Sequence, residues 1–139
     1  MKKTQKKDLT GLTLLGDGRK SRPLKKLEVF PSKTGRKYLV ELETEEFTCL
    51  CPVTGQPDFA KIKIAYVPDK KVVESKSLKL YLWSFRNEGC FHEHVINIIA
   101  QDLEKALEPV WCRVEGQFKA RGGIAIKVSV QTGAKPDNV

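Results

Sequence analysis

The sequence predicts an α+β fold, in which a four-stranded antiparallel sheet carries two antiparallel helices on one face. Three observations lead to it: a period-2 alternation typical of strands, a three- and four-residue repeat typical of helices, and the order of these segments. The order is strand, strand, helix, helix, strand and strand, over residues 38–50, 59–67, 77–88, 91–108, 110–120 and 124–132. Two helices cover one face of such a sheet, so the other face and both edges are free to join copies of the chain.

The strands are recognised by alternation. In 59–67, lysines alternate with apolar side chains, as expected of a half-buried strand. The segment 38–50 begins with the same alternation and enters a loop that two prolines and a glycine keep irregular. Between the last two strands, Arg-Gly-Gly at 121–123 is typical of a tight hairpin.

Two amphipathic helices are predicted in the middle of the chain. The first begins at Ser77, an N-cap residue type, and ends at Gly89, which suits a left-handed terminal residue. The second is followed by Pro109. Their apolar stripes are Leu78, Tyr81, Leu82 and Phe85 in the first, and Phe91, Val95, Ile98, Ile99, Leu103 and Leu107 in the second.

The positive charge gathers at the start of the chain. Of the net charge of +8, residues 1–26 contribute +7, through nine lysines and arginines against two acids. We interpret 1–22 as a basic, flexible leader, followed by one domain (23–134) and a short tail (135–139). A nucleic-acid site is expected on a folded surface, so we expect no direct contact with nucleic acid. The alternative is a basic RNA-binding module, whose salt-sensitive binding would be lost with residues 1–26.

The sequence indicates a cytoplasmic protein with no membrane partner. No apolar run approaches the roughly 18 residues that a spanning helix needs. The basic start is followed by an apolar stretch too short and too broken for a signal peptide. In this compartment cysteines are more often free, catalytic or metal-bound than bridged, and the chain has four: Cys49, Cys51, Cys90 and Cys112.

Cys51 is the candidate nucleophile. It follows a predicted strand at the mouth of a loop, and Asp58 stands seven residues later, where the next strand begins. If these strands are neighbours, the loop brings the thiol and the carboxyl group together. A thiolate attacks electron-poor carbon, and a nearby acid can protonate the atom that becomes negative. The alternative is that Cys51 is merely a small buried apolar residue.

His92 and Glu93 stand at the start of the second predicted helix. A carboxylate there can accept two hydrogen bonds side by side, and a guanine-type edge offers two such donors. The alternative is that Glu93 only favours the positive end of the helix.

The segment Glu-Ser-Lys-Ser-Leu-Lys (74–79) places Ser75 and Lys76 near a helix start, where backbone amides and lysines bind phosphates. Arg121, followed by Gly122, also suits a phosphate, although a plain hairpin turn explains the same residues. Neither GxGxxG nor GxxxxGK[ST] occurs, so the sequence indicates no Rossmann or P-loop site.

A zinc site is a rival interpretation of the same region. Five residue types that zinc favours occur close together in the sequence: Cys49, Cys51, Cys90, His92 and His94. Structural zinc ligands are usually separated by two to four residues, however, and the single-residue gaps here are atypical.

Three separated motifs together resemble one family. "FTCLCPVTGQPDFAKIKIAYVP" (47–68), "VVESKSLKLYLWSFRNEGCFHEHVIN" (72–97) and "RGG" (121–123) resemble the unimodular 7-cyano-7-deazaguanine reductases of the tunnelling-fold superfamily. The resemblance covers roughly residues 22–132, and "ESKSLKLY" (74–81) looks like that family's signature.

The resemblance implies a reaction and the residues that carry it. The enzyme would reduce a nitrile to a primary amine with NADPH, in queuosine biosynthesis. Cys51 would form a covalent thioimide, Asp58 would donate the proton, and His92 would assist. It further implies two binding sets: Val73, Glu74, Ser75, His92 and Glu93 for the deazapurine substrate, and Ser75, Lys76, Arg121 and Gly122 for NADPH.

The resemblance also implies how the open sheet is completed. Subunits of a homo-oligomer would join their sheets into a barrel, with active sites between subunits, and no metal is implied. Related tunnelling-fold enzymes that act on pterins use zinc, so a zinc-dependent cyclohydrolase-like protein acting on a pterin or purine is the alternative. The 74–79 segment favours the reductase.

Overall fold

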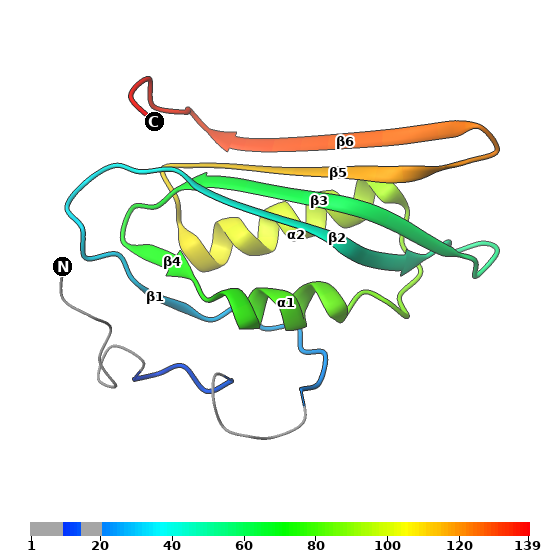
Figure 1. The fold of residues 1–139 in the computed structure, drawn as a ribbon, viewed down its shortest axis with the longest axis horizontal. Coiled ribbons are helices and arrows are strands. Elements are labelled where there is room, and N and C mark those ends of the chain that lie inside the picture. The colour runs from blue at the N-terminus through cyan, green and yellow to red at the C-terminus, as the bar shows by residue number, and fades with distance from the viewer. Residues whose placement is uncertain (1–9, 15–20) are drawn as a thin grey trace.

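The computed structural model describes residues 10–14 and 21–139, and within them the fold has two layers, a sheet of four strands and a pair of helices (Figure 1). The α+β class is confirmed. The elements are β1 (Val29–Pro31), β2 (Val40–Leu50), β3 (Pro57–Val67), β4 (Lys71–Val73), α1 (Ser75–Trp83), α2 (His92–Leu107), β5 (Trp111–Arg121) and β6 (Ile124–Gly133).

The four long strands form one antiparallel sheet in the order β2-β3-β5-β6, which confirms the predicted sheet. In β3 the apolar residues Ala60, Ile62, Ile64 and Tyr66 are buried, as the alternation predicts. The Arg121 hairpin is also confirmed. Gly122 and Gly123 both have positive φ (59° and 77°), the backbone that a tight hairpin joining twisted strands requires.

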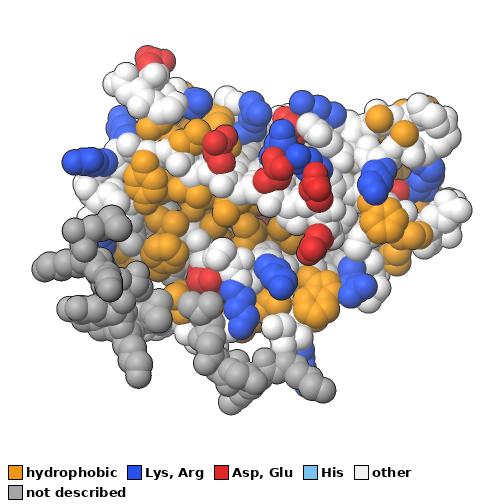
Figure 2. All heavy atoms as spheres, in the orientation of Figure 1, with side chains coloured by type: hydrophobic (Ala, Val, Ile, Leu, Met, Phe, Trp, Pro, Cys, Tyr) orange, Lys and Arg blue, Asp and Glu red, His pale blue; other side chains and the backbone are white. Residues whose placement is uncertain are grey.

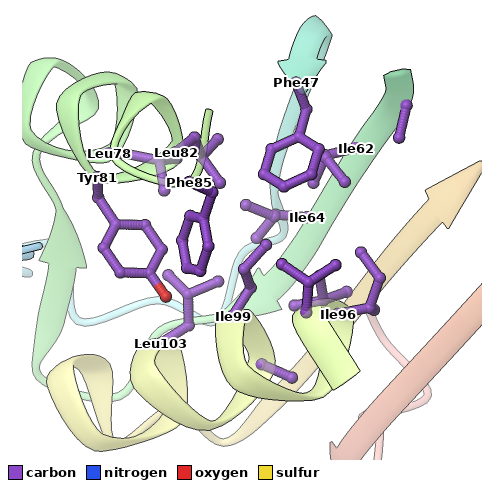
Figure 3. Close-up of a cluster of buried hydrophobic side chains, with 14 of the residues drawn as sticks. Phe47, Ile62, Ile64, Leu78, Tyr81, Leu82, Phe85, Ile96, Ile99 and Leu103 are labelled. Carbon is purple, nitrogen blue, oxygen red and sulfur yellow. The ribbon is translucent and has the colours of Figure 1, made fainter. Parts of the chain in front are cut away.

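Both helices lie on the same face of this sheet, and the core fills the space between the layers (Figure 3). Ile62 and Ile64 come from the sheet, Phe85 follows α1, and Ile96 and Ile99 come from α2. Gly116 allows the close approach of α2 to β5, because a Cβ atom at this position would lie 2.4 Å from Cδ1 of Ile96.

The predicted first helix, 77–88, was wrong at both ends. It begins at Ser75 because Glu74, rather than Ser77, is the N-cap, and the Glu74 carboxylate accepts hydrogen bonds from the amides of Lys76 (2.8 Å) and Ser77 (2.7 Å). The helix ends at Trp83, and turns follow it. Gly89 does not adopt a left-handed backbone; it forms a bridge with Leu50 beside the end of β2 instead.

Other predictions needed smaller corrections. On α2, Ile96 is buried although it is not part of the predicted apolar stripe. Two residues of that stripe are partly exposed instead: Ile98 is 39% exposed, and Phe91, the N-cap, is 51% exposed. The short strands β1 and β4 were not predicted, since three residues are too few to show a period. They form a separate two-stranded sheet that leads into α1.

Most of the predicted basic leader, 1–22, lies outside the described residues. Within 10–14, the backbone amide of Thr13 donates hydrogen bonds of 3.1 and 3.2 Å to the buried carboxylate of Glu28. No helix of the described part of the chain has the length and apolarity that a membrane crossing requires.

Candidate active site

One end of the sheet gathers the residues with reactive side chains. At this end β2 turns into β3, α2 begins, and β5 turns into β6, on the right of Figure 1. The antiparallel register places Cys49 opposite Asp58, so the loop that starts at Cys51 folds back beside the start of β3. This register confirms the condition of the prediction, that the strand before Cys51 and the strand that begins near Asp58 are neighbours.

Asp58 is the centre of this arrangement. It is 7% exposed, and its two carboxylate oxygens have different partners. Oδ2 lies 3.1 Å from Nε2 of His92, and Oδ1 forms an ion pair with Nη2 of Arg121. The imidazole of His92 stacks on the ring of Phe118, with centroids 3.9 Å apart and planes at 10°. Side chains from two elements, α2 and β5, therefore hold the one buried carboxylate that β3 carries.

The Cys51 thiol stands in a loop that stabilises negative charge. The loop closes through two backbone hydrogen bonds, from the amide of Cys51 to the carbonyl of Gln56 (2.8 Å) and from the amide of Gly55 to the carbonyl of Cys51 (2.9 Å). A hydrogen bond from the Thr54 hydroxyl, aided by the amides of Thr54 and Val53 and by the Arg121 guanidinium, lowers the pKa of Cys51 to about 6. At neutral pH this residue is therefore mostly a thiolate.

The other three thiols have the opposite electrostatics. Burial raises the pKa of Cys49 to about 11 and that of Cys112 to about 11, and burial also raises the pKa of Cys90. These three side chains are protonated at neutral pH. Of the four cysteines, Cys51 alone is suited to act as a nucleophile.

A second group of the predicted site residues lies at the far end of the sheet. Val73 at the end of β4 donates its backbone amide to the hydroxyl of Tyr66 at 3.1 Å. Tyr66 is eight residues along β3 from Asp58, which at about 3.3 Å per residue puts the two ends roughly 26 Å apart. Glu74, Ser75 and Lys76 follow Val73 directly in the chain, so they lie at the same end of the sheet as Val73.

The predicted binding residues are thus divided between two clusters. We call the first the thiol end: Cys51, Asp58, His92, Glu93, Arg121 and Gly122. The second is the α1 end: Val73, Glu74, Ser75 and Lys76. Each predicted binding set, for substrate and for cofactor, has members at both ends, so a single chain does not bring either set together.

At the thiol end, Glu93 lies in the first turn of α2 and is exposed. At the α1 end, the Glu74 carboxylate is buried and used to cap the helix, whereas Ser75 is exposed. Ser75 and Lys79 border an open groove of about 550 Å³ between β2 and α1. Figure 2 shows hydrophobic side chains gathered in a band over these two elements.

Some functional candidates were missed by the sequence analysis. Thr54 carries no pattern of its own, because its role depends on the way that the loop closes around Cys51. Glu28 is missed because its contacts are tertiary. Its carbonyl accepts the Glu74 amide (2.9 Å) and its amide donates to the Ser77 hydroxyl (2.9 Å), which anchors the α1 end.

The cations of both ends fit a phosphorylated cofactor. Arg121 stands on an exposed hairpin, where the glycines that follow leave open space, and its side chain is 42% exposed. At the α1 end, Lys76 and Lys79 form no ion pair with another described residue. The amides of Lys76 and Ser77 are already taken by Glu74, so a phosphate at this helix start would have only the lysine side chains as donors.

The zinc interpretation gains no support from the arrangement of its ligands. Across residues 10–14 and 21–139, no three His, Cys, Asp or Glu side chains converge closely enough to hold a metal ion.

The four-stranded sheet with two helices on one face defines the class of the protein, an α+β protein of the tunnelling-fold type, and its thiol end brings Cys51 and the Asp58–His92 pair to the same arginine, Arg121. Comparison with solved structures agrees on the fold. The crystal structure of an archaeosine synthase QueF-Like in the apo form matches with a TM-score of 0.65, over 70% of this chain and 96% of that chain, at 22% sequence identity.

Comparisons of sequence identify the family within this class. A family model described as QueF-like protein matches residues 57–137. A curated protein from Syntrophus aciditrophicus (strain SB) is 56% identical over 94% of this chain and 92% of its own length. Another, from Anaeromyxobacter sp. (strain K), is 53% identical over 86% of this chain and 98% of its own length. Both are named NADPH-dependent 7-cyano-7-deazaguanine reductase. The chain belongs to this QueF-like family, and the predicted resemblance is confirmed.

Replacing Thr54 tests the origin of the thiolate. In Thr54→Val the hydroxyl that stabilises the Cys51 thiolate is gone, so the pH midpoint of Cys51 alkylation should rise above about 6. Alkylation by iodoacetamide at pH 6 should slow by about two- to tenfold, followed by mass spectrometry of the Cys51 peptide. Thr54→Ser keeps the hydroxyl and should react like the wild type. An unchanged midpoint in Thr54→Val would contradict this assignment.

Proposed function

We propose that the protein reduces the nitrile of 7-cyano-7-deazaguanine to the primary amine of 7-aminomethyl-7-deazaguanine, with NADPH as reductant, as a step in queuosine biosynthesis. The observation that carries the proposal is the Cys51 thiolate beside the buried Asp58–His92 pair. The names of relatives that are 52–58% identical support the substrate and the cofactor.

The residues of the thiol end account for the first step. Cys51 Sγ adds to the nitrile carbon, a C–S bond forms, and the electron pair of one C–N π bond moves to nitrogen. That nitrogen takes a proton from the Asp58–His92 pair, and the product is a covalent thioimide on Cys51. This step makes the carbon a better hydride acceptor than the free nitrile.

The reduction then needs one further proton from the protein. When bound, NADPH would supply one hydride to the carbon in each of two rounds. In the first round the nitrogen keeps the proton that it took in thioimide formation, the C–S bond breaks, and Cys51 leaves as a thiolate, which releases a neutral imine. In the second round the same nitrogen takes one more proton and becomes the amine. The nitrile thus gains two hydrides and two protons, and Cys51 is restored.

The remaining residues would bind and orient the two reactants. The exposed Glu93 carboxylate can accept the ring N–H and the amino group of the deazaguanine edge together. Val73, Glu74, Ser75 and His92 would complete the substrate pocket. The cofactor phosphates would be held by the side chains of Ser75, Lys76 and Arg121 and by the backbone at Gly122.

The division of the site supports a homo-oligomer. A single small substrate cannot touch two clusters that lie roughly 26 Å apart along β3. The edge strands β2 and β6 are available for pairing with other copies. We therefore propose that the α1 end of one subunit meets the thiol end of the next, which forms the active site. We also propose a cytoplasmic location, in keeping with four free cysteines, and no direct nucleic-acid partner.

Turnover tests the reaction and its nucleophile together. With 7-cyano-7-deazaguanine, the wild type should consume two NADPH per amine formed, measured by absorbance and by mass spectrometry of the product. Cys51→Ala should lose activity by at least about a thousandfold, because covalent capture is lost. Cys90→Ser, whose thiol has no part in the reaction, is the matched control and should stay active. An inactive wild type that carries one zinc per subunit would instead favour the cyclohydrolase-like alternative.

Mixing defective variants tests whether the site is shared. Cys51→Ala damages the thiol end and Lys76→Glu damages the α1 end, so each alone should be nearly inactive. Co-expressed in equal amounts, they should recover about a quarter of the wild-type activity, because some sites take an intact end from each of two subunits. Cys51→Ala mixed with Asp58→Asn damages the thiol end in both copies and should recover nothing. A lack of recovery in the first mixture, or a monomeric mass by light scattering, would rule out a shared site.

A further inference from the structure

Arg121 faces two groups in the free protein. Its Nη2 forms an ion pair with Oδ1 of Asp58, and its guanidinium is the smallest of the influences that lower the pKa of Cys51, after Thr54 and the loop amides. The residue ends β5 at a point where the pairing with β6 shifts in register, just before the Gly122–Gly123 turn. Although Asp58 is buried, the Arg121 side chain is 42% exposed, so the guanidinium lies between the buried acid and solvent.

These contacts conflict with the later steps of the proposed reaction. A guanidinium at ion-pair distance stabilises the ionised carboxylate, and an ionised carboxylate has no proton to give. The same guanidinium is also one of the groups proposed to hold a cofactor phosphate. A phosphate is a strong and often bidentate partner for arginine, so it competes with Asp58 for the same donors.

We propose that Arg121 is a positioning residue that exchanges partners during the reaction. In the free protein it holds Asp58 and Cys51 ionised. When the nicotinamide cofactor binds, Arg121 moves to one of its phosphates, which leaves Asp58 free to carry a proton. The inference rests on the proposed function and deepens it. Before the exchange, Arg121 favours the nucleophilic thiolate that thioimide formation needs, and the single proton of that step passes from solvent through His92, the other member of the pair. After it, Asp58 keeps His92 as its partner, and one proton from solvent can pass through His92 to Asp58 and on to the substrate nitrogen.

The surroundings of Asp58 make Arg121 the decisive charge. The groups that face this carboxylate come from three elements: His92 from α2, Arg121 from β5, and the thiols of Cys49 and Cys51 from β2 and its loop. Cys49 is neutral because burial raises its pKa to about 11. Among these groups, arginine is the one that stays cationic at every pH of interest, so its departure removes the fixed positive charge from both Asp58 and Cys51.

The exchange can be followed without turnover, through the pH profile of Cys51 alkylation by iodoacetamide. The wild type should show a midpoint near 6. In Arg121→Gln the midpoint should be higher, and the rate at pH 6 should fall by about two- to fivefold. Arg121→Lys, which keeps a cation, should shift less. The matched control is Lys119→Gln: Lys119 lies on the same strand with its ammonium 5.7 Å from the centre of the Phe59 ring, and its loss should leave the midpoint in place.

The decisive experiment repeats the pH profile of Cys51 alkylation with saturating NADP⁺, whose binding is confirmed by calorimetry. In the wild type NADP⁺ should raise the midpoint toward that of Arg121→Gln and leave the rate at pH 9 unchanged, whereas the midpoint of Arg121→Gln should not move further. If bound NADP⁺ merely blocks access to Cys51, the alkylation rate will fall at every pH, and this result would overturn the proposal. A wild-type midpoint that NADP⁺ leaves unchanged would also overturn it. If NADP⁺ does not bind at all, the proposed function itself fails, and the exchange fails with it.

Discussion

The buried carboxylate of Asp58 joins the three segments that meet at the thiol end of the sheet. A buried charge is costly unless it is paired, and Asp58 has a partner for each oxygen, His92 from α2 and Arg121 from β5. The stack of His92 on Phe118 fixes the imidazole in turn. Because α2 and the last hairpin are held by the same carboxylate, the position of the loop around Cys51 and its electrostatics depend on this contact.

The two ends of the long β3 strand explain why one chain carries an incomplete site. The thiol end has the proposed nucleophile and acid, and the α1 end has the helix start that Glu28 and Glu74 hold in place. Neither end has enough residues to surround a deazapurine together with a dinucleotide. The proposed head-to-tail meeting of the two ends between subunits would solve this problem and would pair the exposed strand edges as well.

The sequence predicted those features that depend on local periodicity. It gave the four long strands, the second helix and the hairpin at Arg121, and from the adjacency of β2 and β3 it placed Cys51 near Asp58. It failed where a tertiary contact decides: Glu74 rather than Ser77 caps α1, and Gly89 pairs with Leu50 rather than ending a helix. The Arg121–Asp58 ion pair needs the register of three strands, which no local pattern contains.

Capture of the nitrile by the Cys51 thiolate can be seen in an intact-mass measurement. The protein is mixed with 7-cyano-7-deazaguanine without NADPH, and its mass is followed before and after peptide digestion. We expect a gain on Cys51 equal to the whole mass of the substrate, because addition to a nitrile expels nothing. An adduct on another cysteine, or no adduct under conditions where turnover occurs, would show that Cys51 does not capture the nitrile.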